Sequence, residues 1–192
     1  MAFLRQFRAA PNLLTLLRLF IIPFLVINIL DAHWKVAFGL FILAGISDGM
    51  DGLLARWLHQ HTKLGLYLDP IADKLLLSTL FLVLTHVHAI PRYVTILVFS
   101  RDLGILLIAT LLFATNTLRD FHPSIFGKIN TLVQIIAVVG IMGSRVFSIP
   151  YLVQTNGVLL KAIAVLAPLS AAQYAWIVIR RVSAPIEPVP TS

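Results

Sequence analysis

Six apolar segments, each about 20 residues long, dominate this sequence and restrict what it can fold into. A helix needs about 20 residues to cross the hydrocarbon core of a bilayer. Only 12% of the residues are charged and the mean hydropathy is +0.93, whereas soluble domains carry about 25% charged residues. The sequence therefore predicts an all-α polytopic membrane protein with six transmembrane helices, over residues 13–31, 35–58, 66–87, 92–115, 127–148 and 156–180.

The two ends of the chain differ from these segments. Residues 3–8 place apolar side chains beside Arg5 and Arg8, which predicts a short N-terminal interfacial helix rather than a cleavable signal. Residues 183–192 contain three prolines and are predicted to be a disordered tail. The expected organisation is one membrane domain, residues 1–182, followed by this tail.

The net charge of +7 bears on partners and on orientation. The basic residues form no clustered face, so we expect membrane lipid and not nucleic acid as the partner. With six spans, eight Lys and Arg residues fall on the side of the two termini and three on the other. The positive-inside rule then places both termini and the loop after the second span in the cytoplasm. The predicted location is a bacterial inner membrane.

Four of the eight acidic residues are Asp48, Asp51, Asp69 and Asp73. Carboxylates in membrane helices are costly unless they are paired or bind a metal, so they indicate a functional site. Spacings of three and four residues put each pair on one helix face. Two such helices meeting would gather four carboxylates, a suitable site for two Mg²⁺ or Mn²⁺ ions. The absence of cysteine excludes thiolate ligands.

Small residues accompany the first aspartate pair. Gly45, Gly52 and Ala55 lie near Asp48 on the helix. Their missing side chains allow either a flat ligand or another helix to approach closely. Both interpretations remain open from the residues alone.

The pattern D-x2-D-G-x2-A-R-x8-G-x3-D-x3-D spans residues 48–73 and resembles the signature of the CDP-alcohol phosphatidyltransferases at every fixed position. This family resemblance implies a homodimer of six-helix subunits with a polar cavity open to the cytoplasm. The resemblance extends to two flanking motifs, Asn12-x2-Thr15-x2-Arg18 and Gly127-Lys128-x2-Thr131-x2-Gln134.

The resemblance also implies roles for single residues. Asp48, Asp51 and Asp69 correspond to metal ligands, and Asp73 to both a metal ligand and the catalytic base that activates the acceptor hydroxyl. The positions that resemble the CDP-binding site are Thr15, Asp48, Asp51, Gly52, Ala55 and Arg56.

The expected reaction transfers a phosphatidyl group from CDP-diacylglycerol to an alcohol and releases CMP. Metals would neutralise the diphosphate, and a carboxylate would take the hydroxyl proton. Lone cations in apolar helices are suited to an anionic acceptor, which makes Arg101 and Lys128 the candidate acceptor-binding residues. An ion pair between Arg101 and Asp102 is the alternative for this arginine.

The identity of the alcohol is less constrained. Synthases that use glycerol 3-phosphate show a G-K-x-K-T motif, and here Asn130 replaces the second lysine. This replacement predicts one cation fewer in a phosphate pocket. Phosphatidylglycerophosphate is the leading predicted product, because its synthases are the most widespread bacterial members. The alternative is a cardiolipin synthase with phosphatidylglycerol as acceptor, followed by serine or inositol phosphate acceptors. A divalent-cation transporter is a distant alternative. Its acidic residues would be distributed across the membrane depth, whereas the acidic residues of this chain are expected to lie together at one face of the membrane.

Overall fold

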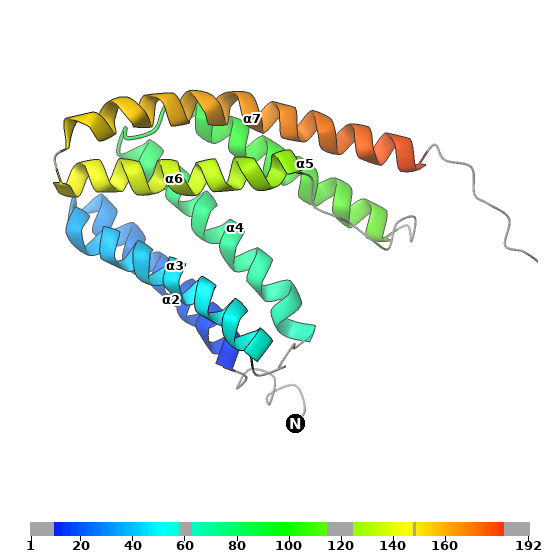
Figure 1. Ribbon diagram of the computed structural model, residues 1–192, viewed down its shortest axis with the longest axis horizontal. Coiled ribbons are helices and arrows are strands. Elements are labelled where there is room, and N and C mark those ends of the chain that lie inside the picture. Colours follow the sequence, from blue (N-terminus) through cyan, green and yellow to red (C-terminus); the bar gives the residue numbers. More distant parts are fainter. Residues whose placement is uncertain (1–9, 58–62, 115–124, 148, 183–192) are drawn as a thin grey trace, which may run out of the picture.

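The computed structural model describes residues 10–57, 63–114, 125–147 and 149–182, with side chains for 13–50, 71–108, 125–147, 149 and 151–180. Within these ranges the protein is helical and has no strand, which confirms the all-α prediction. The predicted interfacial helix and tail lie outside the described residues. The helices are α2 (Ala10–Leu30), α3 (Trp34–Trp57), α4 (Lys63–His86), α5 (Arg92–Ala114), α6 (Ile125–Phe147) and α7 (Pro150–Val182) (Figure 1).

Over the residues whose side chains the structure describes, three helices are long and apolar enough to cross a membrane, namely α2, α6 and α7. Large apolar side chains are exposed along the outside of the bundle, among them Phe20, Leu107 and Val158. Contiguous apolar surface of this kind needs a covering of lipid. The chain is therefore an integral membrane protein. The total of six spans stays a prediction, because side chains are described for only part of α3, α4 and α5.

Two tight turns at one end of the bundle close α2 and α4. Ala32 and His88 both adopt a left-handed backbone conformation with φ of 58°. In the second turn, the Ala89 N–H donates to Leu84 O at 2.8 Å and the His88 N–H to Thr85 O at 3.1 Å. This pairing is the Schellman motif, which satisfies the last carbonyl groups of a helix. The polar breaks predicted after the first and third spans therefore coincide with helix ends.

The last helix begins earlier than predicted. The sequence predicts a start near residue 156, whereas α7 begins at Pro150. Proline is favoured in the first helical turn, because the N–H group that it lacks would have no partner there. The residue that indicated a break is thus the first residue of the helix.

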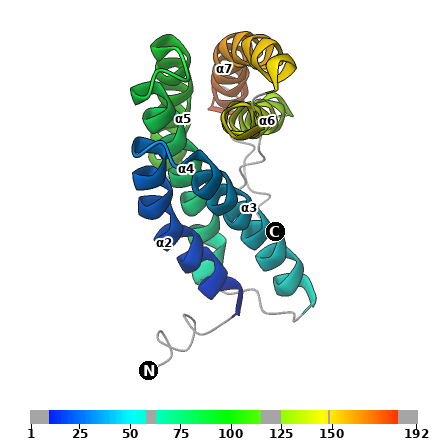
Figure 2. The same ribbon diagram turned by 90° about the vertical axis from the view of Figure 1, so that its left-hand side faces the viewer.

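The helices form two groups that meet at one end and diverge at the other (Figure 1). Helix α2 packs against α3 and α4, while α7 packs against α5 and α6. Figure 2 shows α6 lying between α7 and α3, and α6 also contacts α4. A continuous apolar core joins the groups, with Leu25, Phe81, Val94, Met142 and Ile163 fully buried. The sequence-predicted site residues lie toward the diverging end.

Candidate active site

An arginine on α2 holds the two described aspartates of the motif together. Asp48 lies near the end of α3 and Asp73 in the first half of α4. Arg18 Nη2 lies 2.7 Å from Asp48 Oδ1, and Arg18 Nη1 donates to Asp73 Oδ1. The structure therefore brings one carboxylate of each predicted pair into one site.

Burial differs sharply within this triad. The side chain of Arg18 is fully buried, whereas those of Asp48 and Asp73 are 47% and 46% exposed. The planar guanidinium has donors in a fixed fork, so one arginine can reach two carboxylates. The exposed halves of both carboxylates remain accessible to a ligand. Arg18 thus positions both acids from their buried side.

Sequence reasoning assigned no role to Arg18, although the motif Asn12-x2-Thr15-x2-Arg18 contained the signal. Residues three apart share a helix face, and Thr15 and Arg18 are both fully buried on α2. A buried charge in a membrane helix needs a partner, and the nearest acidic cluster in the sequence supplies it.

We expect Arg18→Lys to lower kcat/KM by at least about tenfold, the loss from one weakened charged hydrogen bond. A single ammonium cannot hold two carboxylates in the geometry of the guanidinium fork. Steady-state CMP release, corrected for folded protein, measures this effect. Arg180→Lys is the matched control, because Arg180 lies at the far end of α7 and is exposed. Unchanged activity per folded molecule in Arg18→Lys would restrict Arg18 to a role in folding.

A small cavity of about 110 Å³ opens beside the triad, and Arg18, Asp48 and Asp73 all line it. Gly45 also lines it, and a Cβ added at Gly45 would meet nothing within 4 Å. The first of the small residues noted in the sequence therefore borders open space beside Asp48. This favours room for a ligand over helix packing at that position.

Several sequence-predicted residues lie where only the helical backbone is described. Asp51, Gly52, Ala55 and Arg56 belong to α3, and Asp69 belongs to α4. Their side chains lie outside the described part of the structure. Among the described side chains, no three His, Cys, Asp or Glu residues form a group that could hold a metal ion. The four-aspartate metal site therefore stays a prediction.

A second cavity, of about 490 Å³, adjoins the first, because both are lined by Thr131 and Ile135 of α6. Arg101 of α5 and Lys128 of α6 line this larger cavity. The structure thus brings together the two residues predicted to bind the acceptor, which are 27 positions apart in the sequence (128 minus 101). Lys74, next to Asp73, contributes a third cation.

Arg101 is held in a fixed orientation. Its Nε and Nη2 donate to Ser170 Oγ at 3.1 and 2.9 Å, and its Nη1 donates to Asp102 Oδ1. Lys74 Nζ also lies 3.4 Å from Asp102 Oδ1. The ion pair that sequence reasoning weighed against acceptor binding is present, and the same guanidinium lines the cavity. The two interpretations of Arg101 are therefore compatible.

Two further residues of this site gave no usable signal in the sequence. Ser170 orients Arg101, and Tyr174, one helical turn further along α7, lines the larger cavity. Both lie in an apolar helix about 70 residues from Arg101, and nothing local connects them.

Asn130 stands where the family motif has its second lysine. It is fully buried on α6 and is absent from the residues that line either cavity. Its Oδ1 and Nδ2 have no hydrogen-bond partner among the described residues. A lysine at this position would place an ammonium in the helix interface, where a lone charge is costly. The predicted loss of one cation from the phosphate pocket therefore stays a prediction.

The geometry defines a helical membrane protein in which one buried arginine joins two half-exposed aspartates. The family model for CDP-alcohol phosphatidyltransferases matches residues 8–179. The chain belongs to this family, as the spacing of its aspartates predicted.

Curated relatives fall into two kinds. The chain is 36% identical over 156 residues to a cardiolipin synthase (CMP-forming) of Rattus norvegicus, a match that covers 72% of this chain and 51% of the relative. It is 36% identical over 134 residues to a probable phosphatidylglycerophosphate synthase of Mycobacterium tuberculosis, covering 66% and 62%. With the CDP-diacylglycerol–glycerol-3-phosphate 3-phosphatidyltransferase of Bacillus subtilis it shares 34% over 143 residues, covering 67% and 73%. The chain spans about half the length of the mammalian relatives.

Proposed function

We propose that this protein transfers a phosphatidyl group from CDP-diacylglycerol to glycerol 3-phosphate, forming phosphatidylglycerophosphate and CMP. The observation that carries the proposal is the pair of adjoining cavities. The smaller contains the half-exposed carboxylates of Asp48 and Asp73, and the larger contains the cations Arg101 and Lys128. A phosphate held by the cations would place its alcohol near the carboxylates.

The chemistry assigns a role to Asp73. The acceptor hydroxyl oxygen attacks the phosphorus bonded to diacylglycerol, a new P–O bond forms, and the P–O bond to CMP breaks. The hydroxyl proton passes to the Asp73 carboxylate, whose exposed half borders the cavity. Arg18 keeps this carboxylate oriented through its other side.

The donor set suits divalent metal. Asp48 and Asp73 present hard oxygen donors to one cavity. Asp51 lies about one helical turn after Asp48 on α3, and Asp69 lies about one turn before Asp73 on α4. These four residues would hold Mg²⁺ or Mn²⁺ as two ions, which would neutralise phosphate charge when bound. Thr15, Gly52, Ala55 and Arg56 complete the proposed CDP site.

The excess of Lys and Arg beside the termini supports a cytoplasmic active site. The protein would act as a homodimer in the bacterial inner membrane.

Phosphatidylglycerol is the second candidate acceptor, and it would yield cardiolipin. Ile105, Leu132 and Ile135 form an apolar part of the larger cavity, which an acyl-bearing acceptor would use and glycerol 3-phosphate would not. Relatives named cardiolipin synthases support the same alternative.

The deciding experiment offers purified protein labelled CDP-diacylglycerol and Mg²⁺ with each acceptor in turn. The acceptors are glycerol 3-phosphate, phosphatidylglycerol, serine and inositol phosphate. We expect CMP release and phosphatidylglycerophosphate with glycerol 3-phosphate. Cardiolipin formation without use of glycerol 3-phosphate would establish the second candidate. A protein that releases CMP with none of them, yet carries Mn²⁺ across liposomes, would be a transporter.

We expect Arg101→Gln and Lys128→Gln each to raise KM for glycerol 3-phosphate by about tenfold with a smaller change in kcat, because each removes a charged hydrogen bond to the acceptor phosphate. Initial rates at varied acceptor concentration give both constants. Lys161→Gln is the control, since Lys161 is an exposed residue of α7 that lines neither cavity. An unchanged KM in both variants would remove these residues from the acceptor site.

A further inference from the structure

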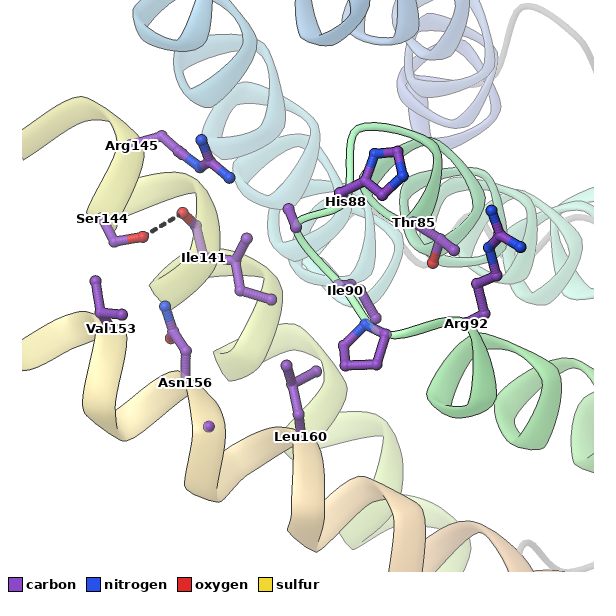
Figure 3. Close-up of a pocket in the computed structure, with 13 residues that line it drawn as sticks. Thr85, His88, Ile90, Arg92, Ile141, Ser144, Arg145, Val153, Asn156 and Leu160 are labelled. Atoms are coloured by element: carbon purple, nitrogen blue, oxygen red, sulfur yellow. Dashed lines mark hydrogen bonds between the residues drawn. The ribbon is translucent and has the colours of Figure 1, made fainter.

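A third cavity, of about 640 Å³, lies at the end of the bundle opposite the aspartates (Figure 3). It is enclosed by the end of α4 with its following turn, the start of α5, the end of α6 and the start of α7. Asp73 lies in the first half of α4 and Lys128 near the start of α6. The cavity is therefore separate from the proposed active site and would face the other leaflet of the membrane.

The charges that line this cavity have one sign. His88, Arg92 and Arg145 line it, and no acidic residue does. Neither arginine forms an ion pair with a carboxylate in the part of the chain that the structure describes. Arg145 instead lies over the ring of Trp34, 5.3 Å from its centroid, an interaction that orients a cation without neutralising it. The two arginines therefore make this cavity suited to binding an anion.

A buried amide lies between this cavity and α6. Asn156 lines the cavity, is only 7% exposed, and its Oδ1 has no hydrogen-bond partner among the described residues. Its amide points from α7 toward α6 (Figure 3), where the absence of a side chain at Gly140 makes room. A Cβ added there would lie 2.3 Å from Asn156 Oδ1. Asn156 Oδ1 is therefore buried against the backbone of α6 and closes the cavity on that side.

One wall of the cavity is apolar. Ile90, Ile141, Val153 and Leu160 line it, and Val153 is 65% exposed on the outer surface of α7. Ile90, Ile141 and Leu160 are already buried in the core, so Val153 is the part of the wall that an acyl chain would cover and a soluble anion would not. An ammonium headgroup would find no carboxylate beside it.

We propose that this cavity binds the phosphodiester of an anionic phospholipid, in the leaflet opposite the proposed active site. The two arginines and His88 bind the phosphate, and one acyl chain lies along the exposed side of the apolar wall. The site does not depend on the proposed reaction, so either can fail without the other.

The test uses the full chain in phosphatidylcholine nanodiscs that contain a photoreactive phosphatidylglycerol. Cross-linked peptides are mapped by mass spectrometry. We expect labelling of residues 85–92 and 141–160 in the wild type, and a fall of about tenfold or more in Arg92→Gln/Arg145→Gln, which loses two charged contacts. Arg180→Gln is the matched control, because Arg180 also lies over a tryptophan, Trp176, at the other end of α7.

A second variant keeps the test informative if the double variant does not fold. His88→Asn removes the imidazole, and asparagine tolerates the left-handed conformation at this position. We expect a smaller but measurable loss of labelling with an unchanged thermal midpoint. Equal labelling in the variants and the wild type, or equal labelling by a photoreactive phosphatidylcholine, would overturn the proposal. Displacement of the lipid label by inorganic phosphate would assign the site to a soluble anion and overturn it as well.

Discussion

Replacing Asp48, Asp51 or Asp69 with Ala is expected to abolish CMP release, with a fall in kcat/KM on the order of 10³-fold, because metal ions contribute several kcal/mol to stabilising phosphoryl charge and each 1.4 kcal/mol is tenfold in rate. Each change removes one charged oxygen from the proposed metal site. For Asp48 the change also removes a partner of the buried guanidinium of Arg18, so protein stability must be measured beside activity.

Two measurements separate these effects. Mn²⁺ binding, followed by electron paramagnetic resonance, reports the metal site, while the thermal midpoint reports folding. Asp31→Ala is the matched control, because Asp31 is an exposed aspartate in the turn at the opposite end of the bundle. Near-normal activity at limiting Mg²⁺ in any one variant would remove that aspartate from the ligand set.

Asp73→Asn is expected to lower kcat by about 10²- to 10⁴-fold, the usual contribution of a positioned general base, while CDP-diacylglycerol binding stays close to that of the wild type. The asparagine oxygen can still accept a hydrogen bond from Arg18 Nη1, as Asp73 does, so the local structure should persist. What the variant lacks is the basicity needed to take the acceptor proton.

Single-turnover CMP release and equilibrium binding of CDP-diacylglycerol test this expectation together. The opposite result, loss of substrate and metal binding with kcat largely retained at saturation, would make Asp73 a ligand without a role in proton transfer. Asp31→Asn is the matched control, because it makes the same chemical change at an exposed aspartate away from the site.

Helix positions and the family motif could be predicted because both depend on residues close together in the chain. A run of about 20 apolar residues specifies a helix through the bilayer whatever surrounds it. The spacing of Asp48, Asp51, Asp69 and Asp73 likewise follows from helical periodicity. Helix ends were predicted within a few residues where polar breaks were clear, and missed at Pro150, where one residue type suits both a break and a first turn.

Contacts between distant segments required the tertiary structure. Arg18 donates to an aspartate 55 positions away, and Arg101 to a serine 69 positions away. No local pattern encodes such a pairing, because it depends on which helix faces meet after packing. The same packing buries Asn130 on one side of α6 and leaves Lys128 lining a cavity on another. The sequence by itself determined the class of fold, the family and the acidic motif. Only the tertiary structure decided which cation contacts the aspartates, and only it revealed the cationic cavity at the opposite end of the bundle. Both depend on how helices that are distant in the sequence pack together.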